Sequence, residues 1–226
     1  VASGARNLAV FTAASETFNR RNIGMAVDES LAEFSRLIPT ARTLARQQKS
    51  GSIKFRGYIS TVFGCPFEGK VPAKKVLKVV ERLADLGVEQ ISLGDTIGVA
   101  TPNQVDEIIK PALKMVGAKR LAVHFHDTRG TALANTLRSL ELGVRIVDSS
   151  AGGLGGCPFA PGATGNLATE DLVYMLDGLG MRTGIDLDAL CGISLELSQR
   201  MRRPISSRYL QAYSSARERA QSCSPV

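Results

Sequence analysis

Two histidines separated by one residue are the sharpest chemical signal in the sequence. His124 and His126 lie in the segment Leu121-Ala-Val-His-Phe-His-Asp127, and they are the only histidines of the chain. Side chains alternate along a strand, so residues two apart point to the same face of a sheet. Imidazole nitrogens are common ligands of divalent metals. The spacing therefore predicts a metal site, and the alternative is a pair of polar strand-end histidines that contact water or Asp127.

A glycine-rich loop further along the chain carries two more reactive groups. Residues 151–171 contain too much glycine and proline for a helix or strand, and they hold the thiol of Cys157 and the amide of Asn166. A long loop in a compact domain is usually either functional or disordered. Two imidazoles and an amide oxygen form a mixed ligand set that suits Mg²⁺ or Mn²⁺. The loop is therefore predicted to lie at the same site as the histidines.

The thiol of Cys157 allows two kinds of chemistry. With an ordinary pKa of roughly 8.5, a cysteine is mostly protonated at neutral pH. It can then act as a general acid, or as a nucleophile if a base activates it. The alternative is a small buried core residue, which is the usual role of a free cysteine.

Two carboxylates, Asp95 and Glu170, are further candidates. Asp95 ends an apolar run and precedes Thr96, so it could contact metal or substrate, or instead bond to nearby backbone N–H groups. Glu170 falls in the first turn of a predicted helix, where the helix dipole favours acids in any case. Spacing alone does not single out either residue as catalytic.

The elements that would position these groups alternate between strands and helices. Apolar, β-branched runs predict strands at residues 8–15, 53–62, 88–93, 120–123 and 144–147. Apolar stripes at helical spacing predict helices at about 28–48, 72–86, 130–142, 169–178, 186–201 and 206–220, with a further helix that opens at Thr101-Pro102. Repeated strand–helix units with short connections predict a parallel sheet in an α/β fold.

Polar residues at the end of every predicted strand favour a TIM (β/α)₈ barrel. In such a barrel the reactive residues come from several strand ends, whereas in an open doubly wound sheet they cluster at one switch point. The chain offers about five βα units, and a complete barrel needs eight strands. We therefore predict a partial TIM barrel over residues 1–200 and a C-terminal helix and tail over residues 201–226.

The composition limits the classes of protein to consider. With 44% hydrophobic residues the chain resembles an ordinary soluble globular protein, and no apolar run approaches the roughly 18 residues of a membrane span. Aromatic residues make up 5% and the basic residues are scattered, so neither nucleic-acid nor membrane binding is expected. The net charge of +7 suits either a solvated basic surface or attraction of an acidic small molecule.

The spacing of the four cysteines fits neither a zinc site nor a dense disulfide framework. They are Cys65, Cys157, Cys191 and Cys223. This pattern predicts free thiols in a reducing compartment. Cys191 lies in a helical pattern and is expected in the core.

Several motifs together resemble the 3-hydroxy-3-methylglutaryl-CoA lyase family. They are Gly153-Leu-Gly-Gly-Cys-Pro-Phe-Ala160, Gly165-Asn-Leu-Ala-Thr-Glu-Asp-Leu172, Ser92-Leu-Gly-Asp-Thr-Ile-Gly98, Leu121-Ala-Val-His-Phe-His-Asp-Thr128 and Ala132-Leu-Ala-Asn-Thr136. The resemblance extends over most of the chain, from about residue 8 to about residue 190. Related metal-dependent barrel enzymes, such as isopropylmalate and homocitrate synthases, share the His-x-His pair but not the cysteine loop.

The resemblance implies cleavage of 3-hydroxy-3-methylglutaryl-CoA to acetyl-CoA and acetoacetate, a reaction of leucine degradation and ketone-body formation. It implies that His124, His126 and Asn166 bind a divalent cation, Mg²⁺ or Mn²⁺. It also implies that Cys157 protonates the acetyl-CoA carbanion.

Further expectations follow from the same resemblance. Asp95 and Glu170 match polar active-site positions of the family. The expected partners are a CoA thioester substrate and a second copy of the chain in a homodimer. The expected location is a bacterial cytoplasm, with the mitochondrial matrix as the alternative.

The chain departs from the family pattern in one respect. In the family the first strand supplies an Arg-Asp-Gly motif, whose aspartate is a further metal ligand and whose arginine stabilises the enolate. This motif does not occur in the 226 residues. We therefore expect the C-terminal portion of a lyase, or a truncated product, that binds metal weakly and turns over poorly by itself. The alternatives are a condensing synthase or aldolase on the same scaffold and a non-catalytic fragment.

Overall fold

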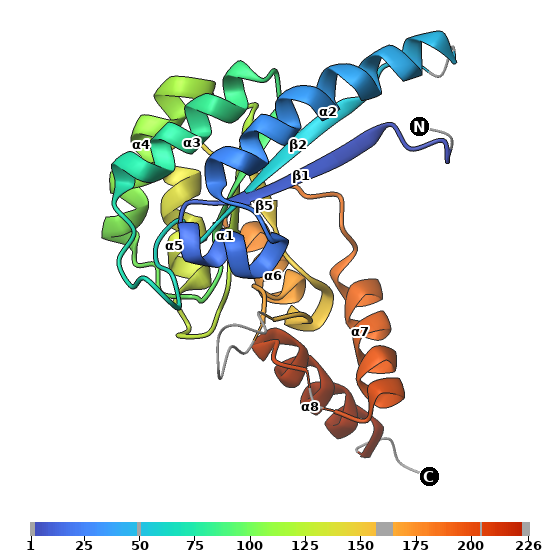
Figure 1. Ribbon diagram of the computed structural model, residues 1–226. Coiled ribbons are helices and arrows are strands. Elements are labelled where there is room, and N and C mark those ends of the chain that lie inside the picture. The colour runs from blue at the N-terminus through green and yellow to red at the C-terminus, as the bar shows by residue number, and fades with distance from the viewer. Residues whose placement is uncertain (1–2, 49–50, 157–164, 204, 223–226) are drawn as a thin grey trace.

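Strands and helices alternate along the chain in the computed structural model, which describes residues 3–48, 51–156, 165–203 and 205–222 (Figure 1). One sheet contains β1 (Asn7–Ala13), β2 (Lys54–Ser60), β3 (Gln90–Asp95), β4 (Leu121–Phe125) and β5 (Ile146–Asp148). The strands lie in chain order, each parallel to the next. In a (β/α)₈ barrel, neighbouring strands follow one another in chain order, as they do here. In an open doubly wound sheet the strand order reverses at a switch point, and no such reversal occurs among these five strands.

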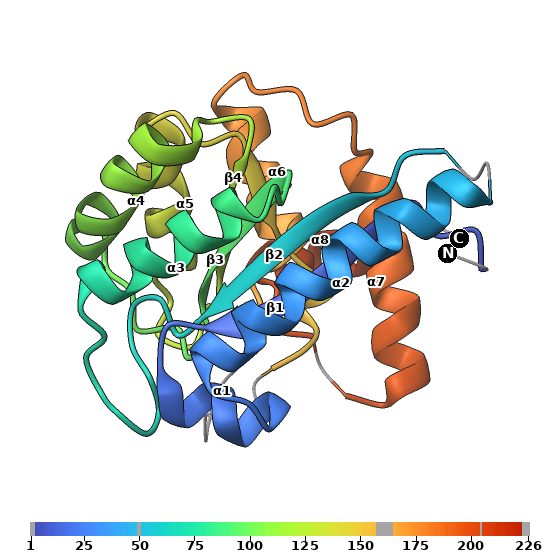
Figure 2. The same cartoon turned by 45° about the horizontal axis from the view of Figure 1, so that its top comes forward.

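Four helices follow the first four strands and cover one face of the sheet. They are α2 (Val27–Gln47), α3 (Ala73–Asp85), α4 (Pro102–Val116) and α5 (Ala132–Glu141). Figure 2 shows α2 and α3 lying over β1 and β2. After β5 come the short 3₁₀ turn η1 (Ala151–Gly153) and the helices α6 (Thr169–Gly178), α7 (Leu187–Met201) and α8 (Arg208–Ser222), which pack against one another.

Strand alternation explains why one face of the sheet meets the helices. Phe55, Ile59 and Leu93 point to the helical side and are at most 1% exposed. Burying such side chains contributes about 2 kcal/mol each. Gly57 lies on the same side, where an added Cβ atom would come within 2.9 Å of the Leu83 side chain. The opposite, inner face carries polar side chains, and it is the face on which the histidine pair lies.

One helix of the structure was not predicted from the sequence. Helix α1 (Glu16–Ile23) has no continuous apolar stripe and buries only Phe18 and Asn19. Its boundaries carry local signals nonetheless: the Ser15 hydroxyl accepts a hydrogen bond from the Phe18 backbone N–H, and Gly24 ends the helix at φ 73°. The strands and helices that were predicted occur in the structure within a few residues of their expected ends.

The C-terminal helices share a small hydrophobic cluster of their own. Cys191, Ile205 and Leu210 are its buried members, and Cys191 is fully buried, as predicted. The domain boundary predicted at residue 200 falls in the last turn of α7, and the cluster joins α7 to α8. The division into residues 1–200 and 201–226 stays a prediction. None of the helices in the described part of the chain has the length and apolar composition of a membrane-spanning segment.

Candidate active site

Strand β4 brings the two histidines to the C-terminal end of the sheet. The ring centroids of His124 and His126 lie 5.2 Å apart, with the ring planes inclined at 62°. In the strand register His124 is the partner of Gly94 on β3 and of Asp148 on β5. The rings therefore lie side by side, as strand alternation predicts.

Burial keeps both imidazoles neutral at physiological pH. It lowers the pKa of His126 to about 4, with a smaller contribution from neighbouring His124. It also lowers the pKa of His124, against the opposing effect of Asp148. A neutral imidazole has one free lone pair, which is the form that binds metals. The Nδ1 atom of His126 is buried without a hydrogen-bond partner in the described part of the chain. A buried unpaired nitrogen is costly, and a bound cation would remove that cost.

Asn166 joins the histidine pair through the backbone. An isolated antiparallel bridge pairs His126 with Asn166. Two flanking hydrogen bonds hold it, from the Asp127 N–H to the Gly165 carbonyl at 3.1 Å and from the Leu167 N–H to the Phe125 carbonyl at 3.1 Å. Side chains of directly paired residues lie on the same side of the bridge. The three residues predicted to bind a metal therefore lie together at one end of the sheet.

The carboxamide of Asn166 is held by the loop that precedes it. Its Nδ2 atom donates a hydrogen bond to the Leu154 carbonyl at 2.8 Å. This bond orients the amide and leaves its oxygen, the atom that binds metal ions, for other partners. Among the described residues no group of three or more His, Cys, Asp or Glu side chains could hold a metal, so the predicted ligand set depends on this amide as its third donor.

The two ends of the glycine-rich loop meet without room for side chains. A Cβ atom on Gly165 would lie 2.2 Å from the Gly153 carbonyl oxygen and 2.5 Å from that of Gly155. Gly165 also has a φ of +115°, which side chains rarely allow. Cys157 lies in the segment 157–164, outside the described residues, so its role stays a prediction.

Glu170 is a fully buried carboxylate that ties three elements together. Both of its oxygens accept a hydrogen bond at 2.9 Å from the Gly152 backbone N–H in η1. One of them also accepts a short hydrogen bond from the Ser194 hydroxyl in α7. The residue thus anchors the start of the cysteine loop to α6 and α7. Its catalytic role stays a prediction.

Asp95 lies at the same end of the sheet but on the other face. Its register partner on β4 is Phe125, the neighbour of both histidines, so its side chain points toward the helices. Its two oxygens accept hydrogen bonds from the backbone N–H groups of Val99 and Ala100, each at 3.0 Å. Burial raises the pKa of Asp95 to about 6, although these bonds oppose the shift. The Asp95 carboxylate therefore holds the loop between β3 and α4 in place through these hydrogen bonds. Its catalytic role stays a prediction.

Comparison with known proteins decides the family. Residues 1–196 match the model of the HMGL-like family. This chain belongs to the HMGL-like family. The match confirms the predicted α/β barrel class, of which the described residues contain five adjacent strands.

Named relatives of this HMGL-like chain agree with that result. The mitochondrial hydroxymethylglutaryl-CoA lyase of Bos taurus is 49% identical over 212 residues, which cover 94% of this chain and 63% of that protein. This chain therefore spans less than two thirds of the length of that relative. The crystal structure of hydroxymethylglutaryl-CoA lyase from Pseudomonas aeruginosa superposes with a TM-score of 0.86 at 42% identity, over 95% of this chain and 69% of that one. An HMG-CoA lyase from Acinetobacter baumannii, solved with coenzyme A and 3-methylmalate, superposes with a TM-score of 0.84 at 40% identity. The match covers 93% of this chain and 67% of that one.

The inner face of the HMGL-like sheet holds a charged cluster to which sequence reasoning assigned no role. The Asp148 carboxylate on β5 accepts hydrogen bonds from Arg56 on β2 at 2.6 Å and from the Ser92 hydroxyl on β3 at 2.9 Å. One of its oxygens also lies 3.9 Å from Nδ1 of His124. The contacts join strands that are distant in sequence, so no local pattern could have revealed them.

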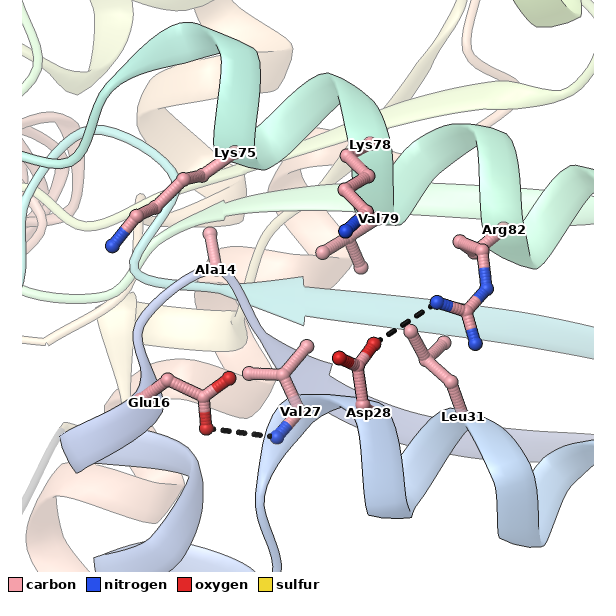
Figure 3. A pocket seen from close by; sticks show the side chains of 9 residues that line it. All are labelled: Ala14, Glu16, Val27, Asp28, Leu31, Lys75, Lys78, Val79 and Arg82. Atoms are coloured by element: carbon pink, nitrogen blue, oxygen red, sulfur yellow. Dashed lines mark hydrogen bonds and ion pairs between the residues drawn. The ribbon is translucent and has the colours of Figure 1, made fainter.

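Two pockets differ in their relation to this site. A pocket of about 440 Å³ opens beside Asn166 and is also lined by Arg129, Ser206 and Arg208. A smaller one, of about 170 Å³, lies between α2 and α3, with Asp28 and Arg82 paired at its edge (Figure 3). The predicted site residues in the described part of the chain do not line the smaller pocket. The pocket beside Asn166 also contacts Asp127, the residue that follows His126, so it opens next to the predicted site.

Proposed function

We propose that this protein cleaves 3-hydroxy-3-methylglutaryl-CoA to acetyl-CoA and acetoacetate. The observation that carries the proposal is the meeting of His124, His126 and Asn166 at one strand end, in a chain 49% identical to a named hydroxymethylglutaryl-CoA lyase. The reaction needs a group that stabilises charge on the substrate oxygens and a group that protonates the departing carbon. The proposal assigns the first task to a metal site and the second to Cys157.

The residues present fit a divalent cation such as Mg²⁺ or Mn²⁺. Two neutral imidazoles and an amide oxygen are a suitable mixed donor set, and the unpaired Nδ1 of His126 marks a polar atom that lacks a partner. When bound, such a cation would polarise the hydroxyl and carboxylate oxygens of the substrate as a Lewis acid. The contribution of the chain is to hold the three donors in place through β4 and the His126–Asn166 bridge.

The proton count of the cleavage balances with one thiol. The tertiary hydroxyl of the substrate gives its proton to solvent water as the carbon–carbon bond breaks, and the electron pair of that bond passes to the acetyl-CoA carbon as an enolate. Cys157 gives its proton to this carbon. Solvent later returns one proton to the thiolate before the next turnover, so the protons balance. The anchoring of its loop by Glu170 and Gly165 supports this role, because a general acid must be held within hydrogen-bond reach of its target.

A CoA thioester is the proposed substrate class. The Acinetobacter baumannii relative was solved with coenzyme A. The pocket beside Asn166 is lined by Arg129 and Arg208, and guanidinium groups suit the phosphates of such a ligand. The homodimer stays a prediction. The bovine relative is named a mitochondrial protein and the Pseudomonas aeruginosa relative comes from a bacterium, so both predicted locations stay predictions.

The test is release of acetoacetate from 3-hydroxy-3-methylglutaryl-CoA by the purified chain, with Mg²⁺ or Mn²⁺ and with a chelator. We expect product only when metal is present. Cys157→Ser should lower the rate by about 10²–10⁴-fold, the usual contribution of a general acid, while Mn²⁺ binding measured by electron paramagnetic resonance is unchanged. The matched control Cys223→Ser should keep the rate of the parent.

Two outcomes would contradict the proposal. Absence of acetoacetate with every metal, from folded protein that binds Mn²⁺, would favour a non-catalytic chain. Condensation of acetyl-CoA with a 2-oxo acid, without cleavage of the proposed substrate, would favour the synthase alternative.

A further inference from the structure

We propose that Asp148, held by Arg56 and Ser92, is a positioning residue that orients the His124 imidazole and selects its tautomer. The inference rests on the proposed function only where His124 is taken as a metal ligand. The tautomer itself is a property of the metal-free protein.

The four residues come from four adjacent strands. Arg56 lies on β2, Ser92 on β3, His124 on β4 and Asp148 on β5. His124 and Asp148 are direct register partners. Neighbouring strands lie about 4.8 Å apart, so their side chains emerge next to each other on the inner face. The sheet register alone therefore brings a carboxylate beside the first imidazole of the pair.

The carboxylate is fixed by two neighbours. The Nη2 atom of Arg56 donates to both oxygens of Asp148 at 2.6 Å, and the Ser92 hydroxyl donates to Oδ2 at 2.9 Å. Hydrogen bonds between charged groups are about twice as strong as neutral ones. The side chains of Arg56 and Asp148 are 24% and 20% exposed, so solvent screens the pair only in part. The position of Oδ2 is therefore set before any ligand binds.

This fixed oxygen faces one nitrogen of His124. Oδ2 of Asp148 lies 3.9 Å from Nδ1 of His124, too far for a direct hydrogen bond but close enough for electrostatic attraction. A negative oxygen attracts an N–H and repels a lone pair. It therefore favours the tautomer with the proton on Nδ1, which leaves the lone pair on Nε2. His124 would then present Nε2 to a cation.

His126 provides an internal contrast. Its Nδ1 is buried and has no hydrogen-bond partner in the described part of the chain. The Asp148 carboxylate lies within 4 Å of a ring nitrogen of His124, and in the described part of the chain it has no such contact with His126. Removal of the Asp148 charge should therefore change the tautomer of one histidine and leave the other as it was.

A purely structural role for the ion pair makes a different prediction. An Arg56–Asp148 bridge that only holds strands together would change stability when it is removed, without any specific effect on one imidazole. Such pairs often contribute little net stability, because desolvation offsets the attraction. The tautomer of His124 separates the two roles.

The experiment uses the metal-free chain labelled with ¹⁵N in its two histidines, at pH 8, where both rings are neutral. Long-range ¹H–¹⁵N spectra report which nitrogen carries the proton. We expect the Nδ1–H tautomer at His124 in the parent and a shift toward Nε2–H in Asp148→Asn. The dissociation constant for Mn²⁺ should rise by about 10–100-fold, the usual effect of losing such a partner.

Matched variants keep the test decisive. Asp106→Asn breaks a different arginine–aspartate pair, with Arg138 on the surface of α4 and α5, and should change neither the tautomer nor the Mn²⁺ affinity. If Asp148→Asn fails to fold because Arg56 is left unpaired, the double variant Arg56→Gln/Asp148→Asn removes both charges and should show the same tautomer shift.

An unchanged His124 tautomer in a folded variant without the Asp148 charge would overturn the inference. So would an equal shift at both histidines, or an equal effect of Asp106→Asn. If the tautomer shifts but the parent neither binds Mn²⁺ nor releases acetoacetate, the proposed function fails and the positioning of His124 by Asp148 stands.

Discussion

Asp95 and Glu170 are buried carboxylates of the kind that is stable only when nearby groups donate hydrogen bonds. Both are 0% exposed, and both accept bonds from backbone N–H groups of adjoining turns. Burial of Asp95 disfavours its charged form, whereas the N–H donors favour that form. Burial has the larger effect on Asp95 and raises its pKa to about 6. At the residue scale, the charge of this side chain is therefore sensitive to mildly acidic pH.

The raised pKa of Asp95 predicts a pH-dependent stability. Between the unfolded value of 3.8 and the folded value of about 6, the folded state binds a proton that the unfolded state does not. The resulting stabilisation is fully present below the unfolded pKa and is lost as pH rises through about 6. We expect the free energy of unfolding of the parent, relative to Asp95→Asn, to fall by about 2 kcal/mol between about pH 4.5 and about pH 7.5. Urea unfolding at several pH values measures this difference.

The control for this prediction is Asp177→Asn, at an exposed position of α6. Its stability relative to the parent should change little over the same range, because its side chain is exposed to solvent in the folded chain. A flat difference between the parent and Asp95→Asn would show that the Val99 and Ala100 N–H groups outweigh burial.

At the scale of elements, the loop between β5 and α6 is held at both ends rather than left free. Glu170 binds η1, and Asp171 accepts hydrogen bonds from the Tyr209 N–H and the Ser207 hydroxyl, each at 2.8 Å. Asp171 therefore caps α8 from a neighbouring helix. The adjacent acids at the start of α6 thus connect the loop and the C-terminal helix to one another. This gives the first-turn acids of α6 a structural role beyond their interaction with the helix dipole.

Gly165→Ala should disrupt the base of this loop. Its new Cβ would meet two carbonyl oxygens at 2.2 and 2.5 Å, and backbone atoms cannot move aside as a flexible side chain can. We expect a loss of about 2–4 kcal/mol in the free energy of unfolding, from steric overlap and from the strained φ. Displacement of neighbouring Asn166 should also weaken Mn²⁺ binding. Urea unfolding and metal titration measure the two effects.

Gly24→Ala is the matched control, since Gly24 also has a positive φ, of +73°, but open space around it. It should cost about 1 kcal/mol, because only the backbone strain remains. Equal losses in the two variants would show that the crowding at Gly165 has no effect of its own.

At the scale of the whole molecule, helices cover one face of the sheet and a polar cluster occupies the other. The apolar outer face supplies most of the core, while Arg56, Ser92, His124 and Asp148 lie together on the inner face. Polar groups brought together in this way need partners, and the unpaired Nδ1 of His126 still lacks one among the described residues. A ligand that supplies this partner should therefore stabilise the folded chain as a whole.

Mn²⁺ should accordingly raise the unfolding temperature. A ligand that binds only the folded state at about 100 times its dissociation constant adds about 2.7 kcal/mol of stability. For a chain of this size that corresponds to a rise of roughly 5–10 °C. Differential scanning calorimetry with and without metal measures the shift, and addition of a chelator should reverse it.

His126→Ala should abolish most of the rise, because it removes a proposed ligand. An equal rise in the parent and in His126→Ala would place the metal elsewhere and contradict the site.

Much of the architecture could be predicted from local patterns. The five strands and most of the helices were found because apolar side chains recur at spacings of two or of three to four residues wherever one face is buried. Helix α1 was missed because it buries too few residues to leave such a stripe. Among the site residues, the placement of His124 and His126 on one face followed from strand alternation alone. Asp95 shows the limit of this reasoning, since its position at a strand end did not reveal which face it occupies.

The sequence by itself determined the βα alternation, the shared face of the two histidines and the resemblance carried by the glycine loop. These features depend on neighbours in the chain. Only the tertiary structure decided that Asn166 returns beside His126, that Glu170 holds the loop, and that Asp148 faces His124. Each of these contacts joins separate elements, and it exists only because the strand register and the path of the loop place the two partners within a few ångströms.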